Sequence, residues 1–257
     1  MTPPALIEAD SLTVRYPKAT APAVDGVSFR LAPGECLGLV GASGCGKSTV
    51  ARALLGLQPV ASGRILWQGR DTAAFSAREK AEYRRAVQIV FQDTLGALNP
   101  RMRIRTALDE VLRVHRRERF PTAADRSARI LALLDRVELP AETADRYPHE
   151  LSGGQRQRIG IARALAVEPR LLVADEPVSA LDVAVQAQVL RMLRGLLDET
   201  GLSMLFVSHD LAVVRCLCPR ALVMHAGRIV EEGPTEKLFS SPSAPFTKEL
   251  LSAVPRL

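Results

Sequence analysis

The stretch Gly41-Ala42-Ser43-Gly44-Cys45-Gly46-Lys47-Ser48 reads G-x-x-x-x-G-K-S, which is the spacing of a phosphate-binding loop. The apolar residues 36–40 before it are typical of a buried parallel strand, and residues 49–55 after it are typical of a helix. Glycines let backbone N–H groups face a phosphate, and the start of a helix adds a positive dipole end. This context predicts an α/β fold in which Lys47 reaches the terminal phosphates of a nucleotide and Ser48 ligates Mg²⁺.

Lysine at position 47 supports this interpretation, because only five of the 34 basic residues are Lys. A compact ammonium group fits inside a nest of backbone amides where a planar guanidinium would not. The alternative is a glycine-rich turn with a surface lysine. The flanking strand and helix argue against that alternative.

The composition is that of an ordinary globular protein, with 47% hydrophobic and 24% charged residues among 257. No apolar run approaches the roughly 20 residues that span a bilayer. Residues 1–5 lack the basic start and apolar core of a signal peptide, so we expect a cytoplasmic protein. The four cysteines fit that compartment as free thiols, and Cys216-x-Cys218 is too isolated to predict a zinc site.

Part of the net charge of +6 lies between Arg101 and Arg119, where seven Arg face three acidic residues. Three interpretations are open: a solvated helix face, a nucleic-acid patch, or a surface near anionic lipid or a membrane partner. Aromatic residues are only 4% of the chain and no recognition motif is present, so nucleic acid is disfavoured. The solvated face is the default.

Three short strand-like pieces precede the loop, over residues 6–9, 12–16 and 23–31. They predict an antiparallel sheet. Tyr16 ends the second piece, and its ring has two interpretations: it stacks on a purine base, or it is an ordinary half-exposed strand tyrosine. Further elements follow the loop in the order strand, charged helix and buried strand, over residues 63–70, 76–85 and 86–91.

Residues 94–150 change to helical apolar spacing, with a helix start at Thr122 and a stop at Pro140, so we expect an inserted helical subdomain. Leu151-Ser152-Gly153-Gly154-Gln155 then opens a helix that runs to about Glu168. Ser152 is a suitable N-cap, but each glycine in a helix costs about 1 kcal/mol against Ala. A close ligand would explain the two glycines, so this stretch predicts a second anion site.

The apolar strand 170–174 ends in two acids, Asp175 and Glu176. After a phosphate loop, the first acid can hold Mg²⁺ and the second can polarise an attacking water. Ser179–Asp182 leads into a helix over 183–200, and the buried strand 203–208 ends at His209. His209 is either a γ-phosphate contact or a surface histidine. Residues 221–233 predict a hairpin, and the tail from Pro234 is too short to be a domain.

The order of these motifs resembles that of ATP-binding cassette (ABC) ATPases over essentially the whole chain. The resemblance implies a P-loop NTPase (RecA-like) α/β core with an N-terminal antiparallel β subdomain and an inserted α-helical subdomain. It implies an ATP-binding domain over 1–233, with the helical subdomain at about 94–160, and a short C-terminal tail over 234–257. The cofactors implied are ATP and Mg²⁺.

The resemblance also assigns roles to residues of this chain. Catalysis falls to Glu176, His209 and Gln92, and Mg²⁺ binding to Ser48, Gln92 and Asp175. ATP contacts fall to Tyr16, Gly41, Ala42, Ser43, Gly44, Cys45, Gly46, Lys47, Ser48 and Thr49. The family signature is Leu151–Gln155, whose Ser152, Gly153, Gly154 and Gln155 contact the ATP of a partner cassette, and the D-loop carries Asp182.

A narrower resemblance links residues 91–102, FQDTLGALNPRM, to the F-Q-D-x-x-x-x-L-N-P-R-M segment of peptide and nickel importer ATPases. Residues 246–255 are similar to the tail of that group, but Ala244-Pro245-Phe246 replaces its usual His-Pro-Tyr and no cysteine follows Cys218. The implied partners are a second ATPase, identical or homologous, two transmembrane permease subunits and an extracytoplasmic solute-binding protein, with no nucleic acid. The implied place is the cytoplasmic face of the inner membrane, as a peripheral protein. Peptide, nickel and a metal chelate remain open as substrates.

Two other classes compete with transport. One is a soluble ABC ATPase that acts on DNA or ribosomes. DNA-repair members carry long coiled coils and translation members carry two cassettes, whereas this chain has one cassette and no heptads between Gln92 and the signature. The other is a P-loop kinase or GTPase, against which the signature and His209 argue.

Overall fold

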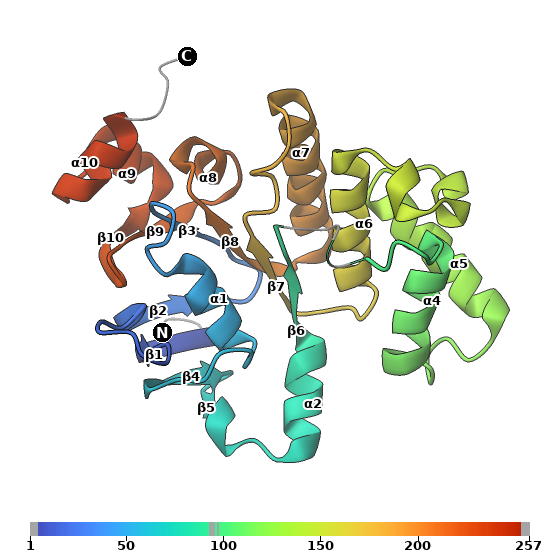
Figure 1. The fold of residues 1–257 in the computed structure, drawn as a ribbon, viewed down its shortest axis with the longest axis horizontal. Helices are drawn as coiled ribbons and strands as arrows, with labels where there is room; N and C mark the ends of the chain where they lie inside the picture. The colour runs from blue at the N-terminus through green and yellow to red at the C-terminus, as the bar shows by residue number, and fades with distance from the viewer. Residues whose placement is uncertain (1–4, 93–95, 97, 253–257) are drawn as a thin grey trace.

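The structure of the protein is a computed structural model, which describes residues 5–92, 96 and 98–252. Two sheets and their helices form the molecule (Figure 1). The smaller sheet has the order β2-β1-β4-β5, and all its pairings are antiparallel. Its strands are β1 (Ile7–Val14), β2 (Val24–Leu31), β4 (Ser62–Trp67) and β5 (Arg70–Asp71).

The two strand pieces expected over 6–9 and 12–16 are one strand, β1, and that expectation was wrong. Ser11 adopts φ 52°, and the register against β2 shifts between Ala9 and Leu12. A bulge of this kind interrupts the alternation of buried residues without ending the strand. Tyr16 therefore lies beyond the end of β1 rather than on a strand.

The larger sheet has the order β10-β9-β3-β8-β7-β6. The five strands from β9 to β6 are parallel, and β10 pairs with β9 as the predicted hairpin. Strands β3, β7 and β8 are buried along their whole length, as their apolar sequences indicate. The bounds are β3 (Cys36–Val40), β6 (Val87–Val90), β7 (Leu171–Asp175), β8 (Ser203–Ser208), β9 (Arg220–His225) and β10 (Arg228–Pro234).

Local signals define the ends of the helices around this sheet. A capping box of Ser76 and Glu79 starts α2, Asp182 caps α7, and Gly201 ends α7 with φ 62°. The bounds are α1 (Lys47–Leu54), η1 (Thr72–Ala74), α2 (Ala77–Ala86), α7 (Val183–Thr200) and α8 (Leu211–Leu217). No helix in the described ranges combines the length and apolarity that crossing a membrane requires.

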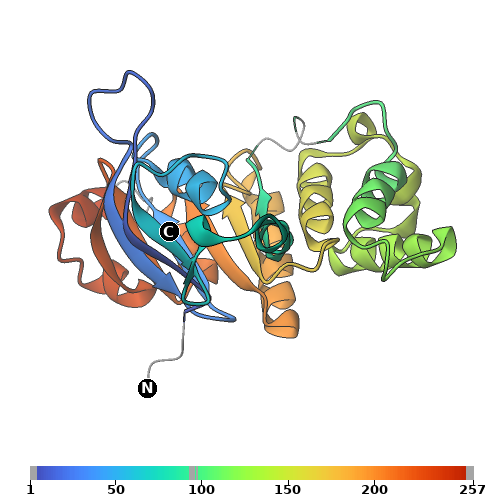
Figure 2. The same cartoon turned by 90° about the horizontal axis from the view of Figure 1, so that it is seen from below.

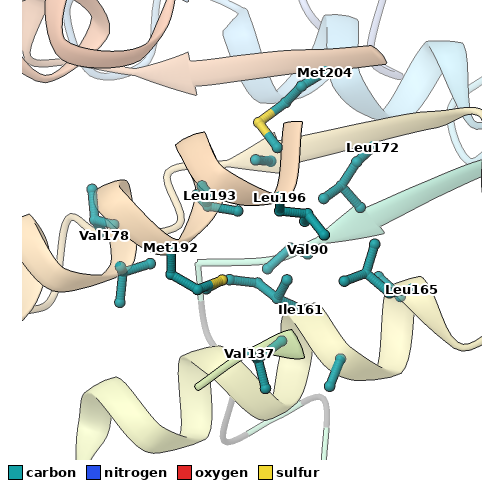
Figure 3. Packing of buried hydrophobic residues seen from close by; sticks show 14 of the residues in the cluster. Val90, Val137, Ile161, Leu165, Leu172, Val178, Met192, Leu193, Leu196 and Met204 are labelled. Atoms are coloured by element: carbon teal, nitrogen blue, oxygen red, sulfur yellow. The ribbon is translucent and has the colours of Figure 1, made fainter. Parts of the chain in front are cut away.

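The expected helical subdomain lies at one end of the larger sheet, beyond β6 (Figures 1 and 2). Its elements are α4 (Ile104–His115), α5 (Ala123–Arg136), the 3₁₀ turns η2 (Ala141–Asp145) and η3 (Pro148–Glu150), and α6 (Gly153–Leu165). Helix α6 ends before the expected Glu168, which adopts φ 52°. Figure 3 shows Ile161 of α6 between Val137 and Val90, so this helix joins the subdomain to the sheet.

Two hydrophobic cores lie on the two faces of the larger sheet. In β7, Leu172 and Ala174 belong to the core shared with α6 and α7. Leu171 and Val173 belong to the core shared with α1 and the antiparallel sheet. Because successive strand residues point to opposite faces, one short apolar strand contributes to both cores.

The tail beyond β10 folds back onto the hairpin as α9 (Thr235–Ser240) and α10 (Pro245–Ser252), neither of which the sequence predicted. The Glu231 carboxylate accepts hydrogen bonds from Ser243 N and Ser243 Oγ, both at 2.7 Å, and from Ala244 N at 3.0 Å. The rings of His225 and Phe246 lie 4.0 Å apart. Glu231 therefore fixes the start of α10.

Candidate functional site

Many of the predicted site residues meet at the carboxyl ends of three neighbouring parallel strands. The phosphate loop follows β3, His209 follows β8, and Asp175 and Glu176 end β7. Ligands bind at this edge of parallel sheets, because the loops and helix starts that leave the strands gather there. The fold therefore brings the phosphate loop, the two acids and His209 to the same end of the sheet.

The phosphate loop requires glycine at Gly46 for two reasons. Its backbone has φ 111°, and a Cβ there would lie 2.3 Å from the carbonyl oxygen of Ala23. Gly46 is also the N-cap of α1, and no side chain caps this helix. The amides of the first turn are thus left for an anion.

Lys47 lies under the loop, with a side chain only 3% exposed. Its Nζ donates hydrogen bonds to the carbonyl oxygens of Gly41 at 2.8 Å and Ala42 at 3.0 Å. The same Nζ lies 3.7 Å from Glu176 Oε1. The ammonium group therefore sits between the loop and the acids of β7.

Ser48 and Asp175 are in direct contact, since Ser48 Oγ donates to Asp175 Oδ1 at 2.9 Å. Burial raises the pKa of Asp175, and the hydrogen bond from Ser48 opposes that shift. The two oxygens are hard ligands of the kind that Mg²⁺ prefers. No group of three or more His, Cys, Asp and Glu residues in the described part of the chain is arranged to hold a metal.

Glu176 and His209 form the second contact of the site. His209 Nδ1 lies 3.1 Å from Glu176 Oε2. Glu176 adopts φ 51°, a left-handed conformation that non-glycine residues rarely take, and its N–H donates to Val207 O at 3.0 Å. Strain of this sort persists where the surroundings impose it, and it is concentrated at functional sites.

Tyr16 approaches the site from the other sheet. Its hydroxyl lies 3.1 Å from Thr49 Oγ1, at the start of α1, and the residue is 37% exposed. The sequence left a base-stacking ring and an ordinary strand tyrosine equally open, and the contact with Thr49 places this side chain beside the phosphate loop. The arrangement leaves the base-stacking interpretation available.

Gln92 follows β6 and lines a cavity of about 750 Å³ together with Ser48 and Asp175. Arg52 lines the same cavity, and its charge lowers the pKa of Asp175. Arg52 was not among the predicted site residues, although its place one helical turn after Ser48 on α1 puts both on one face.

The signature residues lie apart from this cluster. Ser152 caps α6 by accepting from Gln155 N at 3.2 Å, and Ser152 N donates to Gln155 Oε1 at 3.0 Å. Among the described residues, Ser152, Gly153 and Gln155 make no hydrogen bond to the phosphate loop and share no cavity with it. Asp182 likewise only caps α7, by accepting from Val185 N at 3.0 Å.

The two signature glycines differ in their surroundings. A Cβ on Gly154 would lie 2.3 Å from Val185 Cγ1, so helix packing within the chain requires this glycine. A Cβ on Gly153 would meet Leu181 Cδ2 at an ordinary 3.5 Å. The expectation of a close ligand is therefore needed only for Gly153.

Most of the basic stretch is paired inside the chain. Arg105 binds Asp145 at 3.0 Å, Arg113 lies 3.8 Å from Asp109, and Arg119 pairs with Glu168. Arg103 and Arg116 donate to the backbone carbonyls of Asp145 and Val167. These contacts favour a role within the subdomain over a free basic patch.

All four cysteines are free thiols, as expected for reduced cysteines. Cys218 is buried beside Cys36, with their sulfurs 3.4 Å apart, whereas Cys216 is exposed. The fold therefore places Cys218 next to a cysteine that is 182 positions away in the sequence.

Comparisons with known proteins identify the family. The ABC transporter family matches residues 24–179. A Brucella ovis protein assigned by name to peptide import is 49% identical over 99% of this chain and 80% of its own length. The oligopeptide transport ATP-binding protein OppF of Salmonella typhimurium is 49% identical over 93% of this chain and 71% of its own length.

Solved structures agree with these relatives. CbiO1 from Clostridium perfringens, part of the ABC transporter complex CbiONQ, superimposes with a TM-score of 0.82 at 26% identity, covering 92% of this chain and 91% of its own. A dimeric ATP-binding cassette bound to ADP and Pi gives a TM-score of 0.78 at 28% identity, covering 89% of this chain and 98% of its own. The chain therefore belongs to the ABC transporter family and is one of its ATP-hydrolysing cassettes.

Proposed function

We propose that this chain is the ATP-hydrolysing subunit of a peptide importer. The observation that carries the proposal is the 49% identity to OppF over 93% of the chain, together with a complete set of nucleotide-site motifs. Nickel, which the sequence resemblance left open, is the second candidate substrate. A peptide is preferred because the relatives that match the chain over most of its length are named for peptide import.

Two cassettes are needed for each complete ATP site. One chain contains both halves of an ATP site, which are the phosphate loop and the signature at Ser152–Gln155. Among the described residues, however, these two motifs make no contact with each other. A second chain, identical or homologous, would bring its signature helix to this loop. The dimeric state of a cassette with a similar fold supports this arrangement.

The residues present fit a bound Mg²⁺ ion. Ser48 Oγ and Asp175 Oδ1 would hold it, with Gln92 lining the same cavity, and nucleotide phosphates would complete its ligands. The ion neutralises charge on the phosphates when it is bound. Asp175 would then give up its hydrogen bond from Ser48, and the ion would favour its ionised form.

Hydrolysis depends on Glu176 and His209. Glu176 would accept a proton from the water that attacks the γ-phosphorus, and His209 would hold the Glu176 carboxylate and contact the γ-phosphate. Lys47 would turn from the carbonyls of Gly41 and Ala42 to the β- and γ-phosphates. Tyr16 would stack on the base.

The helical subdomain would transmit the state of the site to the membrane partners. The cavity beside Gln92 is lined both by β6 and by α4 and α6, for instance by His115 and Gly160. A permease segment seated there would sense Gln92 and the Mg²⁺ ligands together. We place the chain on the inner face of the membrane, with two permease subunits and an extracytoplasmic solute-binding protein.

Reconstitution tests the proposal. The chain is co-expressed with the permease and ATPase genes beside it, purified as a complex and placed in liposomes with the matching solute-binding protein. ATP-dependent uptake of labelled tri- to pentapeptides, with no uptake of ⁶³Ni²⁺, is the expected result. Nickel uptake without peptide uptake, or purification of the chain with ribosomes or DNA instead of a permease, would contradict it.

A further inference from the structure

A second cavity, of about 570 Å³, lies at the opposite edge of the larger sheet from the phosphate loop. Its wall includes Gly34 before β3, Arg170 before β7 and Ser203 at the start of β8. These positions are at the amino ends of the strands whose carboxyl ends form the nucleotide site. Since β3 has five residues, the two sites are separated by roughly 16 Å of strand.

Four guanidinium groups line this cavity, those of Arg119, Arg129, Arg136 and Arg170, against one carboxylate, that of Glu168. Glu168 is shared, since it pairs with Arg119 and lies 3.4 Å from Arg129. One acid cannot neutralise four cations, so the lining carries an excess of three positive charges at neutral pH.

The charges of Arg136 and Arg170 have no counter-ion among the residues that the structure describes. Arg136 makes no hydrogen bond or ion pair in the described part of the chain. The side chain of Arg170 lies over the ring of Trp67, with its guanidinium carbon 5.7 Å from the ring centre. The Nε of Arg129 is buried and has no hydrogen-bond partner. Burial lowers the pKa of Arg129, and so do the nearby positive charges of Arg136, Arg119 and Arg116.

The cavity joins two parts of the molecule. Arg129 and Arg136 belong to α5 of the helical subdomain, whereas Arg170 and Ser203 belong to the sheet. Glu168 lies on the connection from α6 to β7 and adopts φ 52°. An anion held by both sets of arginines would therefore bridge the subdomain and the core.

We propose that this cavity, which we call the arginine cavity, binds a small polyphosphate anion. Phosphate groups match the forked donors of Arg, and several clustered guanidinium groups favour an anion with more than one negative charge. The volume lies in the range of small-ligand pockets, so a pyrophosphate or the polyphosphate part of a nucleotide fits. The site is separate from the ATP site and does not depend on which solute is transported.

Calorimetric titration with pyrophosphate tests the site. The full chain is first saturated with ADP, so that the phosphate loop is filled, and ionic strength is held constant with NaCl. We expect one further pyrophosphate per chain. Hydrogen–deuterium exchange should slow in residues 166–170 and 200–203 on binding, and not in residues 41–49.

The variants Arg136→Gln and Arg170→Gln should each weaken this binding roughly tenfold or more, because a hydrogen bond to a charged group is lost. Both should leave ATP hydrolysis and the melting temperature unchanged. The control is Arg78→Gln on α2, an exposed arginine far from the cavity, which should bind pyrophosphate like the parent.

Three results would overturn the proposal: no binding beyond the ADP site, equal binding by all variants, or protection confined to residues 41–49. Binding only to phosphatidylglycerol vesicles, with none to free pyrophosphate, would also overturn it, because the arginines would then serve a lipid surface.

Discussion

His209 Nδ1 lies 3.1 Å from Glu176 Oε2, and the other oxygen of the same carboxylate lies 3.7 Å from Lys47 Nζ. Glu176 is thus held between a ring that can donate and a buried ammonium group. The carboxylate oxygens that would accept a proton from water are therefore fixed by contacts on both sides. The contact also couples the strand tips of β7 and β8.

Glu176→Gln should abolish proton acceptance while keeping the shape of the site. We expect phosphate release to fall by about 10²- to 10⁴-fold, with ATP binding intact and an ATP-bound dimer accumulating. Single-turnover phosphate release and size-exclusion chromatography with ATP measure the two effects. Glu150→Gln, at an exposed acid on η3, is the control. A Glu176→Gln chain that hydrolyses ATP at the parent rate would remove the catalytic assignment.

Lys47→Ala should weaken ATP binding by about 10- to 100-fold, because a charged donor to the phosphates is lost. Equilibrium titration with a fluorescent ATP analogue measures the change. Lys80→Ala, at an exposed lysine on α2, is the matched control and should bind like the parent. Equal affinity in the two variants would contradict the phosphate-loop interpretation.

Tyr16→Phe and Tyr16→Ala separate the two features of this side chain. The first removes the hydroxyl that meets Thr49 and keeps the ring, whereas the second removes both. If the ring stacks on the base, only Tyr16→Ala should weaken ATP binding, by roughly tenfold. The affinity for tripolyphosphate, which has no base, should be unchanged in both variants. Loss of affinity in both variants alike would assign the effect to the hydroxyl.

Gly154→Ala should destabilise the fold by about 1–3 kcal/mol, because the new Cβ would lie 2.3 Å from the stiff side chain of Val185. Gly153→Ala is the control, since its Cβ would have an ordinary contact. Denaturant unfolding measures both. We expect Gly153→Ala to fold with parental stability and to lose ATP-driven dimerisation instead. Equal stability of the two variants would show that Val185 can move aside.

Glu231 should make the attachment of α10 sensitive to acid. Burial raises its pKa, but hydrogen bonds to the carboxylate, among them those from Ser243 and Ala244, prevail and bring it to about 2. Because the folded pKa is depressed, the stabilisation is complete above the unfolded value of about 4.3 and is lost as pH falls toward 2. The difference in melting temperature between the parent and Glu231→Gln should be constant near pH 7 and shrink below pH 4. A difference that does not change with pH would contradict this role.

The sequence predicted those parts of the fold whose signals are local. Residues 36–40 and 203–208 are apolar runs that form β3 and β8 over the same bounds, and Asp182 and Gly201 define α7 because capping acts within one turn. Residues 6–16 were wrongly predicted as two strands, because the bulge at Ser11 interrupts the alternation of buried and exposed residues within one strand. The short helices of the tail were missed because contacts with residues earlier in the chain hold them. Glu231 and His225 contact the start of α10, and the Cys218 carbonyl accepts from Thr235 Oγ1 at the start of α9.

The site residues were predictable by motif, but their mutual contacts were not. Ser48 meets Asp175 across 127 positions, a relation that only the order of the strands creates. The need for glycine at Gly154 also could not be predicted, because it arises from the close approach of Val185 on a different helix. The excess charge of the arginine cavity also depends on tertiary structure, because its arginines come from separate elements.

The alternation of side chains along β7 has a mechanical consequence. This strand has no core of its own: its four apolar residues pack alternately into the cores on the two faces of the sheet. A displacement of either face, whether from α6 or from α1, shifts the same backbone and carries Asp175 and Glu176 with it. Asp175 and Glu176 therefore lie at the end of a strand that moves when the packing on either face of the sheet changes. Through β7, a packing change far from the nucleotide can alter the rate of hydrolysis.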